Sequence, residues 1–108
     1  MSRLEAFGTS KQHLVEVVGS LYTKQLQLAP TPYLSLDANR NCILRRIDVL
    51  ESILPFVRER CTILDWGCNH APESCMLRYV LGDQVELHGC DFFPPKTYVA
   101  FHEFAHLH

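Results

Sequence analysis

The stretch that decides the fold is TILDWGCNHA, at residues 62–71. Its first five residues are short, apolar and rich in strand formers, and the residues from Gly67 onward are typical of a turn. Pro72 and Glu73 then suit a first helical turn, because proline loses no hydrogen bond there and a carboxylate favours the positive helix end. Helix-spaced apolar residues follow as far as Gly82, which predicts the helix end. We therefore expect a strand, a tight turn and a helix in succession.

A second strand and a further helix follow this unit. Residues 85–90 read Val-Glu-Leu-His-Gly-Cys and end at Asp91, and apolar residues at helical spacing run from Tyr98 to Leu107. Strand, helix, strand and helix in this order predict a right-handed βαβ unit with parallel strands. The expected fold class is therefore α/β, with a Rossmann-like doubly wound parallel sheet. Because a two-stranded parallel sheet is marginal alone, we expect a truncated domain, the N-terminal part of a longer one.

Helices are expected before the first strand. Apolar residues recur at helical spacing over residues 3–28, and two prolines predict an extended connector over residues 29–32. A clean amphipathic pattern covers residues 39–58, with Asp37 or Asn39 as its N-cap.

The composition fits one ordinary globular domain, in which a helical segment, residues 1–38, precedes the α/β part, residues 39–108. The chain has 108 residues, 47% hydrophobic content and a formal net charge of -2. Basic residues are scattered among acidic ones, so nothing indicates nucleic acid binding. No apolar stretch approaches the roughly 20 residues of a membrane helix, and no secretory signal is visible. Five cysteines without a Cys-x-x-Cys pair favour reduced thiols and a cytoplasmic protein.

The two strand ends predict a ligand site. Gly67 follows the first strand, where the lack of a side chain lets a ligand approach the backbone. Asp91 follows the second strand, 24 residues later. An acid at that point of a neighbouring parallel strand accepts hydrogen bonds from the two hydroxyls of a ribose bound across the crevice. The spacing therefore predicts a nucleoside site.

The residues after Gly67 indicate which nucleoside is favoured. A dinucleotide fingerprint, G-x-G-x-x-G, needs glycine where this chain has Asn69 and Pro72. Glu73 follows in the first helical turn, where its carboxylate would repel a pyrophosphate. It would not repel a ligand that lacks phosphate and carries a cationic sulfonium. S-adenosyl-L-methionine is therefore favoured over NAD.

With these residues in place, the sequence resembles the class I S-adenosylmethionine-dependent methyltransferases over about residues 39–108. Residues 63–68, ILDWGC, match the first motif of that family: an apolar pair, an acid, an apolar residue, glycine and often cysteine. Asp91 matches the acid of the family's second strand. The family's first motif continues with two further glycines, where this chain has Asn69 and Ala71.

The resemblance implies transfer of a methyl group from S-adenosyl-L-methionine to an acceptor that the sequence does not identify. The methionine side of the cofactor would then be lined by Asp65, Gly67 and Cys68. Asp91 would bind the ribose hydroxyls, and Phe92 would lie near the adenine. The candidate cofactor residues are Asp65, Gly67, Cys68, Asn69, Asp91 and Phe92. Since this chemistry depends largely on proximity and orientation, no dedicated catalytic residue is assigned.

Several other patterns have simpler interpretations. Residues 102–106 fit H-E-x-x-H, but a catalytic zinc needs a third protein ligand and only two residues follow, so no metal is expected. Cys68 and His70 need not face each other on a turn, so Cys68 is interpreted as a small turn residue rather than a nucleophile. Trp66 is interpreted as a core residue of the first strand. Three arginines are interpreted as the solvated face of the 39–58 helix: Arg40, Arg45 and Arg46.

The alternative function is that of a non-catalytic α/β domain that binds a partner chain, or of an inactive fragment. The two strands would leave a sheet edge without a neighbour and an apolar face built by Ile63, Leu64, Val85 and Leu87. Exposed edges and apolar faces of this kind promote association. This alternative therefore predicts self-association through the sheet edge.

Overall fold

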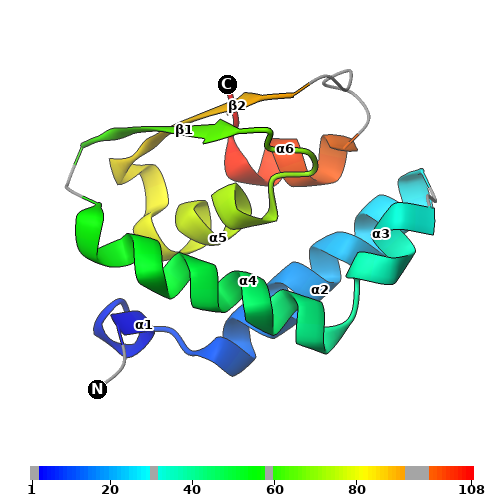
Figure 1. Cartoon of the computed structure of the whole chain (residues 1–108), viewed down its shortest axis with the longest axis horizontal. Coiled ribbons are helices and arrows are strands. Elements are labelled where there is room, and N and C mark those ends of the chain that lie inside the picture. Colours follow the sequence, from blue (N-terminus) through cyan, green and yellow to red (C-terminus); the bar gives the residue numbers. More distant parts are fainter. Residues whose placement is uncertain (1–2, 30–31, 58–59, 92–97) are drawn as a thin grey trace.

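The computed structural model describes residues 3–29, 32–57, 60–91 and 98–108. Within these ranges the chain is a mixed helix and strand structure with six α-helices and a two-stranded parallel sheet (Figure 1), which is compatible with the predicted α/β class. In chain order the elements are α1 (Arg3–Ala6), α2 (Lys11–Leu28), α3 (Pro32–Asp37), α4 (Arg40–Ile53), the 3-10 helix η1 (Leu54–Phe56), β1 (Thr62–Trp66), α5 (Pro72–Leu81), the 3-10 helix η2 (Gly82–Gln84), β2 (Glu86–Cys90) and α6 (Val99–Ala105).

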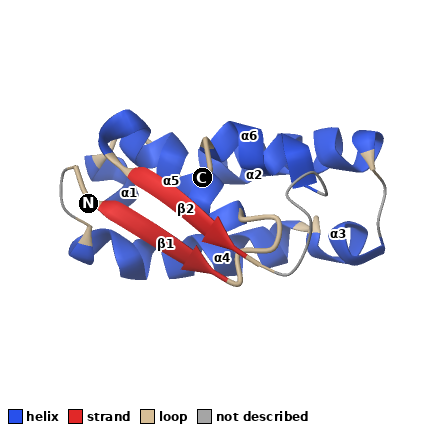
Figure 2. Ribbon diagram, turned by 90° about the horizontal axis from the view of Figure 1, so that it is seen from above, coloured by secondary structure: helices blue, strands red, loops and turns tan. Residues whose placement is uncertain are grey.

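The sheet has the connectivity that the sequence predicted. β1 and β2 are parallel and α5 joins them, with Ile63 opposite Leu87 and Asp65 opposite Gly89. The helices lie on one side of the sheet (Figure 1), and the view from above shows its other face uncovered (Figure 2). In the described residues the helices thus cover one face, whereas the doubly wound sheet that we expected has helices on both faces.

The last residue of the chain returns to β2. The His108 N–H donates to the Leu87 carbonyl oxygen and the Gly89 N–H donates to the His108 carbonyl oxygen, both at 2.9 Å. This is the hydrogen-bond pattern of a parallel pairing. α6 ends at Ala105, earlier than expected, because His106 adopts a left-handed conformation with φ 49°. α6 therefore lies between β2 and His108, which pairs with β2 in the parallel direction, just as α5 lies between β1 and β2.

Successive side chains of β1 point to opposite faces of the sheet, and the helices cover only those on one face. Ile63 packs against the core, as does its partner Leu87, which is fully buried. Leu64 and Trp66 lie on the opposite face and are 58% and 79% exposed. The prediction of Trp66 as a core residue is therefore wrong. For the same reason Ile63 and Leu64 do not contribute to one apolar face, since neighbours in a strand point to opposite sides.

One hydrophobic core joins the N-terminal helices to the βαβ unit. Its almost fully buried members come from all six α-helices and β2, and include Leu4, Leu14, Tyr22, Leu34, Ile47, Leu50, Met76, Leu87 and Phe101. Burial of such side chains is the main favourable contribution to folding. None of the described helices combines the length and the apolar character needed to span a bilayer.

Helix boundaries follow local signals in most places. Asn39 caps α4, and its side chain accepts a hydrogen bond at 3.0 Å from a backbone N–H of the first turn. α4 ends at Ile53 and η1 follows it, because Pro55 has no N–H with which to continue the helical hydrogen bonds. The extended connector expected over residues 29–32 is wrong at Pro32, where α3 begins, since proline is accommodated at the first helical position. Residues 30–31 lie outside the described part of the chain.

Candidate functional site

The turn after β1 lies at the carboxyl end of the sheet and is bonded to the end of β2. The Asn69 N–H donates to Asp91 Oδ2 at 2.6 Å, and the Cys68 N–H donates to the Cys90 carbonyl oxygen at 3.1 Å. Gly67 has φ 64°, a left-handed conformation that glycine adopts without strain. The structure therefore brings this turn and Asp91 together, as their spacing predicted.

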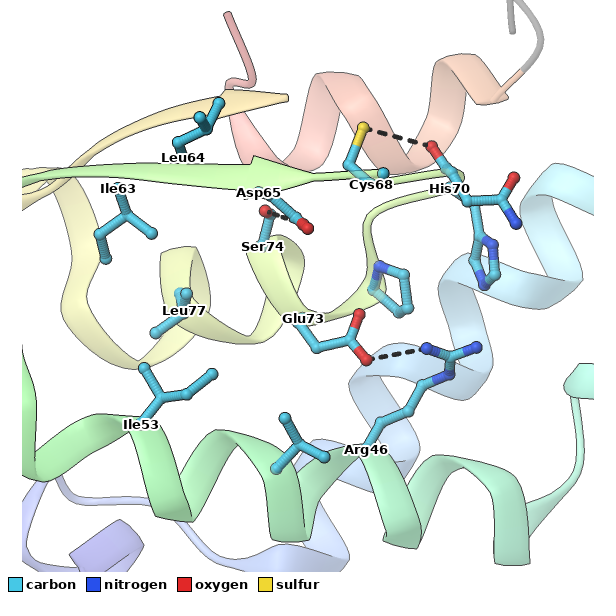
Figure 3. Close-up of a pocket in the computed structure, with 14 residues that line it drawn as sticks. Arg46, Ile53, Ile63, Leu64, Asp65, Cys68, His70, Glu73, Ser74 and Leu77 are labelled. Atoms are coloured by element: carbon cyan, nitrogen blue, oxygen red, sulfur yellow. Dashed lines mark hydrogen bonds and ion pairs between the residues drawn. The ribbon is translucent and has the colours of Figure 1, made fainter. Parts of the chain in front are cut away.

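Asp65 lies on the side of β1 that faces α5 (Figure 3). Its Oδ2 accepts a hydrogen bond from Ser74 Oγ at 2.7 Å. Burial raises the pKa of Asp65, and the hydrogen bond from Ser74 opposes that rise. Asp65 borders a cavity of about 420 Å³, which is also lined by Gly67, Cys68 and Asn69 (Figure 3). Cavities of this volume are typical of small-molecule sites.

A second cavity, of about 320 Å³, lies beside β2 and is lined by Cys68, Asn69, Asp91 and His102. Because Cys68 and Asn69 border both cavities, a ligand that extends from Asp91 to Asp65 must cross the turn. Burial raises the pKa of the Cys68 thiol, and the carboxylates of Asp65 and Asp91 raise it further. Cys68 is therefore a neutral thiol at physiological pH, which suits a lining residue rather than a nucleophile.

His102 supports the turn from α6. Its Nε2 lies 2.9 Å from the Asn69 carbonyl oxygen, so a proton on Nε2 forms a hydrogen bond to the turn. His106 lies beyond the end of α6 in a left-handed conformation. The H-E-x-x-H pattern is therefore not on one continuous helix, as a zinc site of that type requires. The part of the chain that the structure describes contains no group of three His, Cys, Asp or Glu side chains arranged to hold a metal ion.

Arg46 links three helices at the edge of the first cavity (Figure 3). Its Nη1 donates to Glu73 Oε1 at 2.8 Å and its Nη2 donates to Asp37 Oδ2 at 2.7 Å. The side chain is 23% exposed, so the interpretation of Arg46 as part of a solvated face is wrong. The sequence does indicate that Arg46 is partly buried, because it lies three residues after Ile43 and four before Leu50, on the buried side of α4.

This ion pair changes the electrostatic argument about Glu73. The carboxylate accepts a charge-assisted hydrogen bond from Arg46, which offsets much of its negative charge at the start of α5. The repulsion of a pyrophosphate is therefore weaker than the sequence suggested. Asn69 and Pro72 still stand where a dinucleotide site needs glycine.

No protein-family model, curated protein or solved structure matches this chain. Five of the six candidate cofactor residues surround the turn and the two strand ends: Asp65, Gly67, Cys68, Asn69 and Asp91. Phe92 lies outside the described residues. Ser74 and His102 could not be assigned to the site from the sequence, because no short-range pattern connects Ser74 to Asp65 or His102 to the turn.

The arrangement offers a nucleoside two kinds of contact. The carboxylate of Asp91 can accept hydrogen bonds from paired hydroxyls at one end, and the half-buried Asp65 and the Arg46–Glu73 pair supply charges at the other. Between them, the turn presents backbone with a glycine at its start, so a ligand can lie close against it. These are features of nucleotide sites at the carboxyl ends of parallel strands.

Proposed function

We propose that this chain is the S-adenosyl-L-methionine-binding, N-terminal part of a class I methyltransferase with a Rossmann-like doubly wound sheet. One observation carries the proposal: Asp91 and the turn that begins at Gly67 meet at the carboxyl ends of two neighbouring parallel strands, joined by the bond from the Asn69 N–H. Open α/β sheets bind nucleotides and nucleosides at this edge.

In the proposed complex the ribose hydroxyls donate hydrogen bonds to the carboxylate of Asp91. The methionine side of the cofactor lies along Asp65, Gly67 and Cys68, in the larger of the two cavities. A sulfonium placed there is attracted by the carboxylate of Asp65, and the partial burial of the cavity strengthens this attraction.

The proposed reaction is an in-line displacement at the methyl carbon. A lone pair on the oxygen, nitrogen or carbon of the acceptor forms a bond to the methyl group as the carbon–sulfur bond breaks. The electron pair of that bond stays on sulfur, which leaves neutral S-adenosylhomocysteine, and an uncharged acceptor takes over the positive charge and releases a proton to solvent. The protein contributes by holding donor and acceptor close and aligned, so Asp65 and Asp91 act as binding residues.

The proposal predicts that the chain binds S-adenosylhomocysteine through Asp91. In isothermal titration calorimetry, Asp91→Ala should weaken binding by roughly 1–3 kcal/mol, because the ribose hydroxyls lose a charged acceptor. Asp91→Asn is a second variant, since it keeps a side-chain acceptor for the Asn69 N–H but removes the charge. Both variants should retain the circular dichroism spectrum of the parent chain.

Asp83→Ala is the matched control. Asp83 lies in η2, before the start of β2, and its side chain is 92% exposed. Its removal should leave the affinity for S-adenosylhomocysteine unchanged. A parent chain that gives no binding heat, or folded Asp91 variants that bind as tightly as the parent, would contradict the proposal.

A partner-binding α/β domain is the second candidate, and the exposed Leu64 and Trp66 favour it. Two large apolar side chains side by side on an uncovered sheet face are typical of a surface that another chain covers. Absence of any heat with S-adenosylhomocysteine, together with concentration-dependent association, would favour this candidate over the methyltransferase.

A further inference from the structure

A group of polar side chains lies beside the turn, on the side of the N-terminal helices. Its five members come from α2, α3, α4, the turn and α5, and are named here the polar cluster: Tyr22, Asp37, Arg46, His70 and Glu73. Figure 3 shows Arg46 reaching from α4 to Glu73 at the start of α5, at the edge of the larger cavity. The polar cluster therefore connects segments far apart in the sequence to the wall of the proposed site.

Hydrogen bonds join the members of the polar cluster. Tyr22 Oη donates to Asp37 Oδ2 at 2.6 Å and lies 2.7 Å from His70 Nε2. His70 Nε2 is also 3.1 Å from the same oxygen of Asp37. Since the phenol proton goes to Asp37, we assign the proton of a neutral His70 to Nε2, from which it donates to Tyr22 or Asp37. Arg46 then bridges Asp37 to Glu73.

Burial fixes the protonation states of these groups. Tyr22 and His70 are each 1% exposed. Burial lowers the pKa of His70 to about 4, and the positive charge of Arg46 adds to this effect against the influence of Asp37. Burial and the hydrogen bond to Asp37 raise the pKa of Tyr22. At neutral pH the polar cluster thus holds a neutral imidazole and a neutral phenol in a directional hydrogen-bond network.

His70 lies between two residues with strained backbones. Asn69 has φ 51° and Ala71 has φ 59°, a region that residues other than glycine rarely adopt. Such conformations persist only where the surroundings hold them, and they gather at ligand sites. Both backbone groups of Asn69 are hydrogen-bonded to side chains: its N–H to Asp91 and its carbonyl oxygen to His102. The buried imidazole of His70 anchors the residue between the two strained positions.

We propose that the polar cluster positions the 67–71 turn for its ligand, so that α2 and α3 support the binding site through Tyr22 and Asp37. Tyr22 and Asp37 are positioning residues, because they hold the turn through His70 and do not line the cavity, whereas His70 itself borders it. When the anchor is lost, the strained residues relax and the Asn69 N–H leaves Asp91. The identity of the ligand rests on the proposed function, but the positioning of the turn is independent of it.

Amide hydrogen exchange in Tyr22→Phe tests the proposal on the full chain. This variant keeps the aromatic ring, which packs edge-on against Phe101, and removes only the hydroxyl that bonds Asp37 and His70. We expect exchange of the amides of residues 67–71 to accelerate at least tenfold, while amides in the middle of α4 exchange as in the parent. We also expect the Kd for S-adenosylhomocysteine to rise at least tenfold.

Tyr79→Phe is the matched control, because it makes the same chemical change at an exposed tyrosine that bonds His13 outside the polar cluster. It should leave turn exchange and affinity unchanged. Asp37→Asn is a second variant, expected to act like Tyr22→Phe. Parent-like exchange of the turn in Tyr22→Phe and Asp37→Asn would overturn the proposal, as would a uniform loss of protection over the whole chain. If the parent does not bind S-adenosylhomocysteine, the proposed function fails while turn exchange still decides the positioning.

Discussion

Acid should destabilise this protein through the buried imidazole of His70. Burial lowers its pKa in the folded chain to about 4, against 6.5 when the residue is solvated. As the pH falls below about 6.5, the unfolded chain takes up a proton that the folded chain does not bind until the pH nears 4. Stability that is fully present at neutral pH is therefore lost progressively between these two values.

The size of this loss follows from the two pKa values. Between pH 7.5 and pH 5, the linkage relation gives a loss of about 2 kcal/mol in the free energy of unfolding, rising to about 3 kcal/mol below pH 4. The total stability of a domain is about 5–15 kcal/mol. One imidazole thus controls a substantial fraction of the stability in mildly acidic solution.

Urea unfolding followed by far-ultraviolet circular dichroism measures this loss. The parent and His70→Gln are compared at pH 7.5 and pH 5, since glutamine keeps a buried donor near Tyr22 and cannot take up the proton. Burial raises the pKa of Asp65, which acts in the opposite direction, but this effect is present in both proteins and cancels in the comparison. The parent should lose about 2 kcal/mol more than His70→Gln. An equal pH dependence of the two proteins would refute the reasoning.

Two further predictions concern packing and the uncovered face. A Cβ at Gly89 would lie 2.6 Å from Leu107 Cδ2 and 2.8 Å from Cys68 Sγ, so Gly89→Ala should lower the free energy of unfolding by about 1–3 kcal/mol in urea titrations. Gly19→Ala, in open space on α2, is the control and should be neutral or stabilising, so equal effects of the two substitutions would show that the close contact is absent. The parent should associate with rising concentration in size-exclusion chromatography with light scattering, and replacing both Leu64 and Trp66 by threonine should reduce this association. A parent that stays monomeric at every concentration would contradict that expectation.

The order of the elements could be predicted because its signals are local. The turn at Gly67, the proline at the start of α5 and Gly82 at its end each act on backbone within a few residues. Asn39 likewise caps α4 through an N–H of the next turn. Strand, helix and strand in this order then bring Gly67 and Asp91 to the same edge, because consecutive parallel strands place their carboxyl ends together. The candidate site could therefore be located from the sequence alone.

The tertiary structure alone decided which faces of the distant elements meet. Trp66 is as apolar as a core residue, and its exposure depends on which side of β1 the helices cover. Tyr22 and His70 are 48 residues apart, and only the packing of α2 against the turn brings them within hydrogen-bond distance. Arg46 pairs with Glu73 for the same reason. Side-chain pairs of this kind form only when two distant elements are packed together. A short stretch of sequence contains just one member of each pair, so it cannot predict the contact.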